Sequence, residues 1–512
     1  MSLAIAYARA LLGLRAPLVT LETHLMPGLP AFNLVGLPEA AVRESRERVR
    51  SAILNAGFEF PQRRITVNLA PADLPKYGTR YDLAIALSLL AASGQIPAAP
   101  LTEYECIAEL ALTGELRPVR GLLAASLAAR DAARAIMCSV ADGAEATLCD
   151  TARVFSARTL SDVCRHLDHS QQLLPLAPQA RSTAHSTPPQ SPDLRDVAGQ
   201  QRARRALEIA AAGGHNLLMV GPPGTGKTML AMRLPSILPT LSEAEALESA
   251  LVRSVAGTEL AATWRERPFR APHHTASAIA IVGGGTIPKP GEISLAHHGV
   301  LFLDEFTEFD RRVLEVLREP LESQRVTISR AAGHVEFPAD FQLVAAMNPC
   351  PCGYAGDGSG RCLCSAERIS RYRARISGPL LDRIDLQLEV ARDKHWHPRA
   401  LTPDHEPSAV VKERVIAARA RQLARQPTLN ARLTPHDLNR VVHLNDDSVA
   451  LLESAFTRFQ LSARSFHRIL KIARSIADLE NRVEVATSDV AEAFSLRRME
   501  LHASASTLNP AK

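Results

Sequence analysis

The stretch HNLLMVGPPGTGKT, residues His215–Thr228, decides the fold of this chain. Its first half is a short apolar run bounded by Gly, which is typical of a buried parallel strand. Its second half has the P-loop spacing G-x-x-x-x-G-K-T, directly after the strand and before a helix. The sequence therefore predicts a phosphate-binding loop. The residues of the loop are Gly221, Pro222, Pro223, Gly224, Thr225, Gly226, Lys227 and Thr228.

The residue types of this loop indicate its chemistry. Its glycines let the backbone turn its N–H groups toward the phosphates of a nucleotide. Lys227 adds a positive charge for the β- and γ-phosphates, and the Thr228 hydroxyl can ligate Mg²⁺. The helix that begins here presents the positive end of its dipole to the same phosphates. We therefore expect a bound nucleotide with Mg²⁺.

Two later strands end in polar residues that suit phosphoryl chemistry. The apolar segment Gly299–Glu305 ends in Asp304 and Glu305. A P-loop enzyme needs one carboxylate to organise the Mg²⁺ shell and another to polarise the attacking water, which we assign to Asp304 and Glu305 in that order. The segment Phe341–Asn348 ends in Asn348, whose amide could orient the water or sense the γ-phosphate.

The bulk composition is that of a globular protein rather than a membrane or secreted one. The chain has 512 residues, which suggests roughly three domains, and a mildly basic net charge of +5. Its longest apolar run falls short of the about 20 residues that span a bilayer, and its N-terminus makes a poor signal peptide. Four scattered cysteines predict free thiols in a reducing compartment. We expect a cytoplasmic protein with no membrane association.

Residues 1–166 are predicted to form an α/β domain. The loop Asp73–Asp82 and the segment Gly114–Gly121 resemble, in the same order, the proteolytic domain of Lon proteases. In that family the first loop carries a nucleophilic Ser and the second segment carries its Lys partner. Here the two positions fall on Arg80 and Leu123, which cannot do this chemistry. We expect a Lon-like fold without the catalytic dyad, and a generic α/β domain is the alternative.

The rest of the chain divides into three parts. Residues 167–192 are rich in Pro, Ser, Gln and Ala and are predicted to be a flexible linker. Residues 193–395 contain the P-loop and are predicted to form an ATPase core with a parallel sheet. Residues 396–512 have a helical pattern and are predicted to form a helical lid. The predicted fold class is α/β throughout the first two domains.

Four cysteines stand in two close pairs. Cys350 and Cys352 are separated from Cys362 and Cys364 by nine residues of a Gly-rich loop. Four thiolates can make a closed tetrahedral Zn²⁺ site. The C-x-C spacing is tighter than the usual C-x-x-C, so free thiols remain the alternative.

Two predicted loops between the motifs carry basic residues. Lys289 lies in an insertion after the P-loop helix, and Arg330 lies near the turn of a predicted hairpin that ends at Phe337. Such residues can contact nucleic-acid phosphates without reading sequence. Ordinary solvated loops are the alternative.

The order of these motifs resembles that of AAA+ ATPases. The P-loop, the Asp304–Glu305 pair, Asn348, the segment Gly378–Asp385 and the segment Ser462–Arg464 carry the resemblance. It implies that Arg383 is an arginine finger that reaches the neighbouring subunit. It also implies that Arg464 is a second sensor of the γ-phosphate and that the nucleotide is ATP.

Further segments are similar to the ComM/YifB family of magnesium-chelatase-like AAA+ proteins across nearly the whole chain. These are Val35–Glu39, Arg267–His274, Asn348–Gly353 and Ser377–Arg383. The resemblance implies a homo-hexameric ring that binds single-stranded and branched DNA without sequence preference. It also implies a helicase that promotes branch migration during natural transformation. The alternatives are the ATPase motor of a magnesium-chelatase-type complex and an ATP-dependent protease, which Arg80 and Leu123 oppose.

Overall fold

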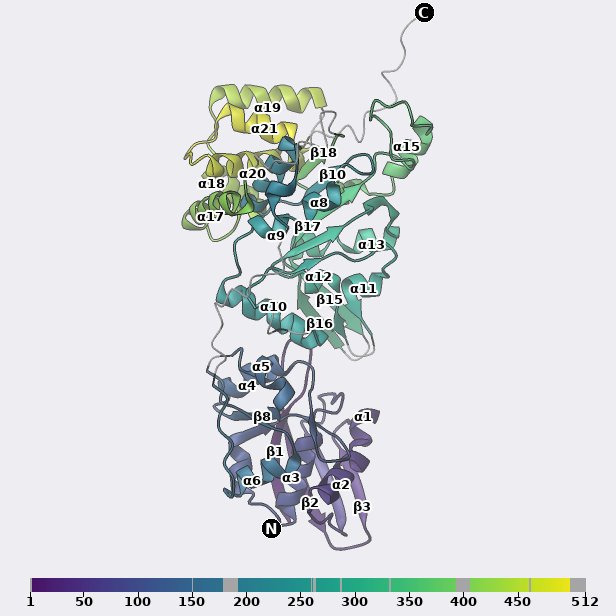
Figure 1. Cartoon of the computed structure of the whole chain (residues 1–512), viewed down its shortest axis with the longest axis vertical. Helices are drawn as coiled ribbons and strands as arrows, with labels where there is room; N and C mark the ends of the chain where they lie inside the picture. Colours follow the sequence, from purple (N-terminus) through teal and green to yellow (C-terminus); the bar gives the residue numbers. More distant parts are fainter. Residues whose placement is uncertain are drawn as a thin grey trace, which may run out of the picture.

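The structure is a computed structural model. It describes residues 2–149, 151–177, 192–258, 260, 264–285, 288–330, 333–392, 406–459 and 462–497. Figure 1 shows an elongated molecule with the N-terminal domain at one end and the ATPase core with its lid at the other. Most of the predicted linker, residues 178–191, lies outside the described residues, as does the start of the predicted lid, residues 396–405.

The N-terminal domain is built on a seven-stranded mixed sheet with the order β3-β4-β2-β1-β5-β8-β9. Strand β2 pairs antiparallel with β1 and β4, and the other neighbours are parallel. The strands are β1 Leu3–Arg9, β2 Leu18–Met26, β3 Ala31–Val35, β4 Arg64–Ala70, β5 Tyr104–Cys106, β8 Ala135–Ser139 and β9 Val154–Ala157; a small hairpin pairs β6 Glu109–Leu110 with β7 Leu116–Arg117.

The core of this domain forms around one apolar helix. All eleven residues of α3, Asp82–Ala92, are buried, because the helix packs against β1 and β2. The helix carries almost no polar side chain, as expected of an element surrounded by its own domain. The remaining helices are α1 Ala40–Arg43, α2 Ser45–Asn55, α4 Leu122–Asp131, α5 Gly143–Ala146 and α6 Leu160–Leu167.

The ATPase core contains a five-stranded parallel sheet with the order β11-β14-β17-β10-β18. Since all five strands are parallel, their carboxyl ends meet at one edge, where ligands bind in open α/β sheets. The strands are β10 Leu217–Val220, β11 Phe269–Arg270, β14 Val300–Leu303, β17 Gln342–Met347 and β18 Leu386–Glu389. Strands β10, β14 and β17 are buried along their whole length, which explains why they are apolar apart from Gln342 at the start of β17.

Short helices and two hairpins surround this sheet. The helices are α7 Gln201–Gly213, α8 Lys227–Ala231, α9 Leu234–Ile237, α10 Glu243–Ala256, α11 Ala278–Val282, α12 Glu292–Leu295, α13 Arg311–Val316, α14 Pro320–Ser323, α15 Ala366–Arg373 and α16 Gly378–Leu381. One hairpin pairs β12 Gly283–Gly284 with β13 Lys289–Pro290, and the other pairs β15 Arg325–Arg330 with β16 Gly333–Pro338.

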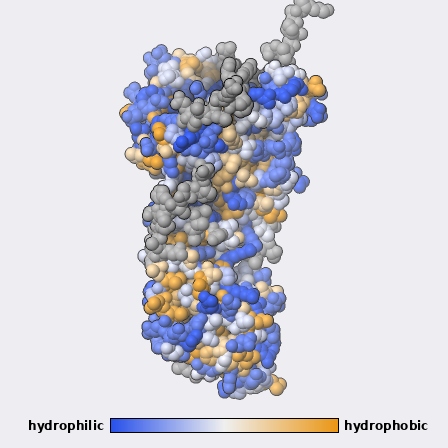
Figure 2. Space-filling view, viewed as in Figure 1, coloured by the Kyte–Doolittle hydropathy of each residue, from blue (hydrophilic) through white to orange (hydrophobic). Residues whose placement is uncertain are grey.

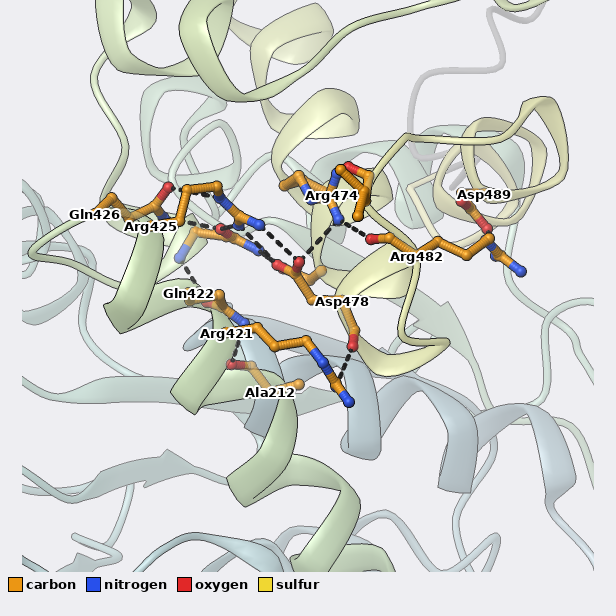
Figure 3. A network of polar contacts seen from close by, with 12 residues as sticks. Ala212, Arg421, Gln422, Arg425, Gln426, Arg474, Asp478, Arg482 and Asp489 are labelled. Carbon is orange, nitrogen blue, oxygen red and sulfur yellow. Dashed lines mark hydrogen bonds and ion pairs between the residues drawn. The ribbon is translucent and has the colours of Figure 1, made fainter.

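The lid is helical, and α17 and α20 pack against α7 of the core (Figure 1). Its helices are α17 Ser408–Arg425, α18 Pro435–Val441, α19 Asp446–Phe459, α20 Ala463–Leu479 and α21 Thr487–Ser495. Figure 3 shows a polar network of the lid, in which the buried carboxylate of Asp478 accepts hydrogen bonds from Arg425 and Arg474. The same carboxylate accepts a hydrogen bond from Asn430. Burial alone would raise the pKa of Asp478, but the Arg425 hydrogen bond and the Arg474 charge lower it below its ordinary value.

The hydropathy of the surface differs between the two ends of the molecule. In the view of Figure 2 the ATPase core and lid are mostly hydrophilic, whereas hydrophobic residues are more frequent over the N-terminal domain. Leu29 and Leu37 of that domain are 89% and 62% exposed. Within the described ranges, every helix is too short or too polar to cross a bilayer.

Candidate functional site

The P-loop connects the buried strand β10 to α8 at the carboxyl edge of the sheet. Gly224 and Gly226 have φ values of 77° and 86°, which glycine adopts without strain. A Cβ atom on Gly221 would lie 2.2 Å from the carbonyl oxygen of Val390, so only glycine fits at this position. Helix α8 begins at Lys227, so its first N–H groups point into the loop.

The Lys227 ammonium lies inside this loop. It donates to the carbonyl oxygens of Gly221 (2.7 Å) and Pro222 (2.9 Å). A third hydrogen bond of 3.3 Å reaches Oδ1 of Asn348 at the end of β17. Burial lowers the pKa of Lys227, and the nearby charge of Asp304 opposes this effect. The structure therefore brings Lys227 and Asn348 together at one point, because β10 and β17 are parallel neighbours in the sheet.

Thr228 and the end of β14 form the second half of the site. The Thr228 hydroxyl donates to Oδ2 of Asp304 over 2.6 Å, and the backbone N–H of Glu305 donates to Oδ1 of the same carboxylate over 2.9 Å. A hydroxyl and a carboxylate are the oxygen ligands that Mg²⁺ prefers. The donor set thus fits a Mg²⁺ ion beside the P-loop. Glu305 has a φ of 51°, a left-handed value that is uncommon for residues other than glycine, so the chain turns at this residue after β14.

His274 is a residue of the site whose role the sequence does not indicate. Its Nδ1 lies 2.9 Å from Oε2 of Glu305. The ring comes from the segment after β11, and β11 pairs with β14, so the sheet places the two residues side by side. The motif Arg267–His274 was the available signal in the sequence, but nothing in its spacing indicates a contact with Glu305.

The two predicted arginines lie apart from this cluster. Arg383 donates to the carbonyl oxygen of Pro379 (2.6 Å) and pairs with Glu322 of the same chain (2.6 Å). Its side chain is only 11% exposed. Arg464 is exposed in the first turn of α20. Within the described residues neither arginine makes a hydrogen bond or ion pair with the P-loop, Asp304 or Glu305.

The two basic residues of the predicted loops lie on hairpins. Lys289 is exposed on β13. Arg330 ends β15 at a turn whose residues 331–332 lie outside the described ranges. The roles predicted for these residues stay predictions.

The four paired cysteines meet directly after Asn348. The sulfur of Cys350 lies 3.3 Å from that of Cys352 and 3.8 Å from that of Cys362, and Cys352 and Cys362 are 3.6 Å apart. All four sulfurs, including that of Cys364, lie within 4.8 Å of one another. Tetrahedral Zn²⁺ with Zn–S bonds of about 2.3 Å requires sulfurs about 3.8 Å apart. The cluster therefore fits the predicted zinc site, and the four other cysteines are buried in the N-terminal domain, outside this cluster.

This cysteine loop touches the nucleotide site. A Cβ atom on Gly353 would lie 2.8 Å from Cδ of Pro223 in the P-loop. The backbone N–H of Tyr354 lowers the pKa of Cys352 to about 6. This lowered pKa favours the thiolate of Cys352, which is the form that would ligate a cation.

The fold and site together define a P-loop nucleotide-binding protein of the AAA+ class. Models of the magnesium chelatase ChlI subunit match most of the chain: "Magnesium chelatase, subunit ChlI" matches residues 193–397, "Subunit ChlI of Mg-chelatase" residues 21–142 and "Magnesium chelatase, subunit ChlI C-terminal" residues 405–497.

Full-length relatives narrow the class to a family. Competence protein ComM of Haemophilus influenzae is 50% identical over 98% of both chains. The uncharacterized proteins YifB of Salmonella typhimurium and Escherichia coli are 49% and 48% identical, each over 98% of both chains. The chain therefore belongs to the ComM/YifB family of magnesium-chelatase-like proteins, which confirms the resemblance seen in the sequence.

Proposed function

We propose that this chain hydrolyses ATP and uses the free energy to move along DNA as a ring of six subunits. The observation that supports hydrolysis is the Thr228–Asp304 contact, which places a Mg²⁺ donor set beside the P-loop with Glu305 one residue away. A loop that only bound nucleotide would not need a second carboxylate at this edge.

Each residue of the nucleotide site has its own role in the proposed hydrolysis. Thr228 and Asp304 would hold Mg²⁺, which when bound neutralises charge on the phosphate oxygens. Lys227 exchanges its carbonyl acceptors for phosphate oxygens. Glu305 accepts a proton from water as the water oxygen bonds to the γ-phosphorus and the bond to the ADP oxygen breaks. Asn348, beside the Lys227 ammonium, orients this water.

Two features support DNA as the partner. Lys289 is exposed at the β12–β13 hairpin, and Arg368 and Arg371 are exposed on α15. Exposed cations on separate elements can follow a phosphate backbone without reading bases. The 50% sequence identity to a protein named for competence favours DNA as the partner over the subunits of a metal chelatase. The activity that we propose is branch migration during natural transformation. In this function Arg383 leaves Glu322 and reaches the ATP of the neighbouring subunit, and Arg464 reaches the ATP of its own.

One experiment tests this function. The ATPase rate is measured with no DNA, with single-stranded DNA and with a four-way junction, at two salt concentrations, and Lys227→Ala is the inactive control. We expect DNA to stimulate the rate and salt to weaken the stimulation, because released counterions drive binding to phosphates. A rate that no DNA changes would favour the second candidate, an ATPase motor for a metal chelatase, which the matching family models support.

We also propose that the four-cysteine cluster binds Zn²⁺. The sulfur separations support this assignment. Purified protein should contain about one zinc per chain, and Cys362→Ser should lower this value. Cys164→Ser is the matched control, because Cys164 is buried far from the cluster in the N-terminal core. Metal analysis that finds no zinc in protein never exposed to chelator would leave the cysteines as free thiols.

A further inference from the structure

Helix α10 packs against the N-terminal domain through an apolar cluster. Ala250 of α10 is buried in this cluster together with Leu123, Leu148 and Cys149 of that domain. Leu123 is fully buried, and the resemblance to Lon proteases assigns it the position of the dyad Lys. The residue at the position that the resemblance assigns to the protease's base therefore packs against Ala250 of the same chain.

Hydrogen bonds surround this apolar contact. Glu145 accepts hydrogen bonds from the Leu123 backbone N–H (2.9 Å) and from the Ser254 hydroxyl of α10. The backbone N–H of Gly121 donates to the carbonyl oxygen of Ser254 over 3.1 Å. The guanidinium of Arg80, at the position of the Lon nucleophile, donates to the carbonyl oxygen of Arg120, directly before Gly121 (2.9 Å). Leu123 thus lies in the contact with α10, whereas the buried Arg80 reaches that contact only through the backbone beside Gly121.

The middle of α10 contacts the ATPase sheet. Oε2 of Glu248 accepts from Nε2 of His298 over 2.7 Å and from Nε2 of His297 over 3.3 Å. Nδ1 of His297 accepts the backbone N–H of Asp340, so its Nε2 carries the proton. Burial lowers the pKa of His297 to about 4, which keeps the ring neutral. A protonated Nε2 cannot ligate a metal, so this trio is a structural contact although its ligand atoms lie within 4.8 Å of one another.

These contacts lie at the starts of the two strands that carry the predicted catalytic residues. His297 and His298 precede β14, which ends before Asp304 and Glu305. Asp340 precedes β17, which ends before Asn348, and the backbone N–H of His298 donates to the carbonyl oxygen of Asp340 over 2.6 Å. Both strands are short and fully buried, so a shift at one end moves the other.

We infer that α10 couples the N-terminal domain to the nucleotide site, and that the surface formed by Leu123, Glu145 and Gly121 is the docking surface for this helix. The partner of that surface is the chain's own ATPase core rather than a peptide substrate. Movement of the N-terminal domain is carried through Ser254 and Ala250 to Glu248, and from there to the starts of β14 and β17. The effect on DNA-stimulated hydrolysis rests on the proposed function, whereas the effect on the two strands does not.

The test introduces a charge into the apolar contact. Ala250→Glu places a carboxylate in the buried cluster, and Ala244→Glu makes the same change on the exposed face of the same helix. Hydrogen exchange is measured for the amides of α4 and for those from His297 to Leu301, in the full chain with and without a non-hydrolysable ATP analogue. ATP affinity is measured separately, because the P-loop lies outside the contact.

We expect Ala250→Glu to speed exchange in α4 by about tenfold or more, which corresponds to about 1.4 kcal/mol or more. Exchange from His297 to Leu301 should also rise, ATP affinity should stay within about twofold, and DNA stimulation should fall toward the basal rate. Ala244→Glu should behave as the unaltered chain does. Should Ala250→Glu not fold, Ser254→Ala removes the hydrogen bond to Glu145 from the same contact, and exchange should rise by a smaller factor.

Two results would overturn the inference. Unchanged exchange in α4 would show that the docking surface is wrong. Faster exchange in α4 with unchanged exchange from His297 to Leu301 would show that α10 docks but does not couple. Absence of DNA stimulation in the unaltered chain contradicts only the proposed function, because the exchange measurements still decide the inference.

Discussion

Replacing Asp385 by Ala should loosen the lid from the ATPase core. The Asp385 carboxylate is 2% exposed and accepts a hydrogen bond from Arg468 of α20. It also lies 3.3 Å from Nδ1 of His215, whose Nε2 lies 2.8 Å from the Ser475 hydroxyl of α20. Removing Asp385 therefore leaves a lid arginine and a core histidine without their shared partner.

The burial of Asp385 sets the expected loss in the free energy that holds the lid to the core. Removing one partner of a buried ion pair costs about 3–5 kcal/mol. Arg468 is 21% exposed, so water replaces part of the lost contact and we expect the lower end, about 3 kcal/mol. Native-state hydrogen exchange of the α20 amides measures this loss, which corresponds to exchange about 100-fold faster. The control is Arg464→Ala on the exposed side of the same helix, which should change the opening free energy by less than about 0.5 kcal/mol. A loss below about 1 kcal/mol for Asp385→Ala would refute the reasoning.

The same residue predicts a pH dependence with a definite sign. Burial alone would raise the pKa of Asp385, but the Arg468 charge and the His215 hydrogen bond hold it well below its ordinary value. A carboxylate with a depressed pKa in the folded state stabilises at every pH above its unfolded value of about 3.9, and this contribution disappears as the pH falls through the folded value. The exchange difference between the unaltered chain and Asp385→Asn should therefore be constant from pH 8 to 5 and shrink only below about pH 4.

Three further predictions concern the nucleotide site. Lys227→Ala and Glu305→Gln should both stop hydrolysis, but only Lys227→Ala should lose ATP affinity, and equal losses of affinity would contradict the two roles. Arg383→Ala should bind ATP and lower the rate by roughly 10³-fold or more, and mixing it with Lys227→Ala should restore part of the activity, unless Arg383 acts in its own subunit. His274→Ala should lower the hydrolysis rate about tenfold at unchanged ATP affinity, because Glu305 loses the group that orients it; an unchanged rate would leave His274 a bystander.

The sequence was sufficient to predict those site residues whose position depends on one short segment of the chain. The P-loop, the Asp304–Glu305 pair and Asn348 each follow a buried apolar strand, so the pattern of one short segment places each at the end of its strand. The parallel sheet then brings these ends together, and the prediction of a common site needed only the fold class. The sulfur cluster was likewise indicated by spacing, although the sequence could not show that the four sulfurs meet.

The remaining contacts join residues far apart in sequence. Asp385 and His215 are separated by 170 positions, and nothing in either segment predicts that they share a buried network with the lid. His274 reaches Glu305 only because β11 pairs with β14. Arg383 was placed at a subunit edge by resemblance, and its pairing with Glu322 depends on the packing of α14, which the sequence pattern does not reveal.

The carboxyl ends and the amino ends of the parallel strands form two opposite edges of the ATPase sheet, and these two edges have different functions. The carboxyl edge holds the nucleotide residues, whereas the opposite edge is where the neighbouring parts of the chain attach. There Glu248 of α10 contacts the start of β14, Arg432 of the lid pairs with Asp340 before β17, and Asp385 joins the starts of β10 and β18 to α20. Because these contacts lie a strand's length from the P-loop, neither the lid nor the N-terminal domain blocks the phosphates through them. Substitutions at this edge should therefore alter the coupling between ATP turnover and movement of the domains while leaving the affinity for ATP nearly unchanged.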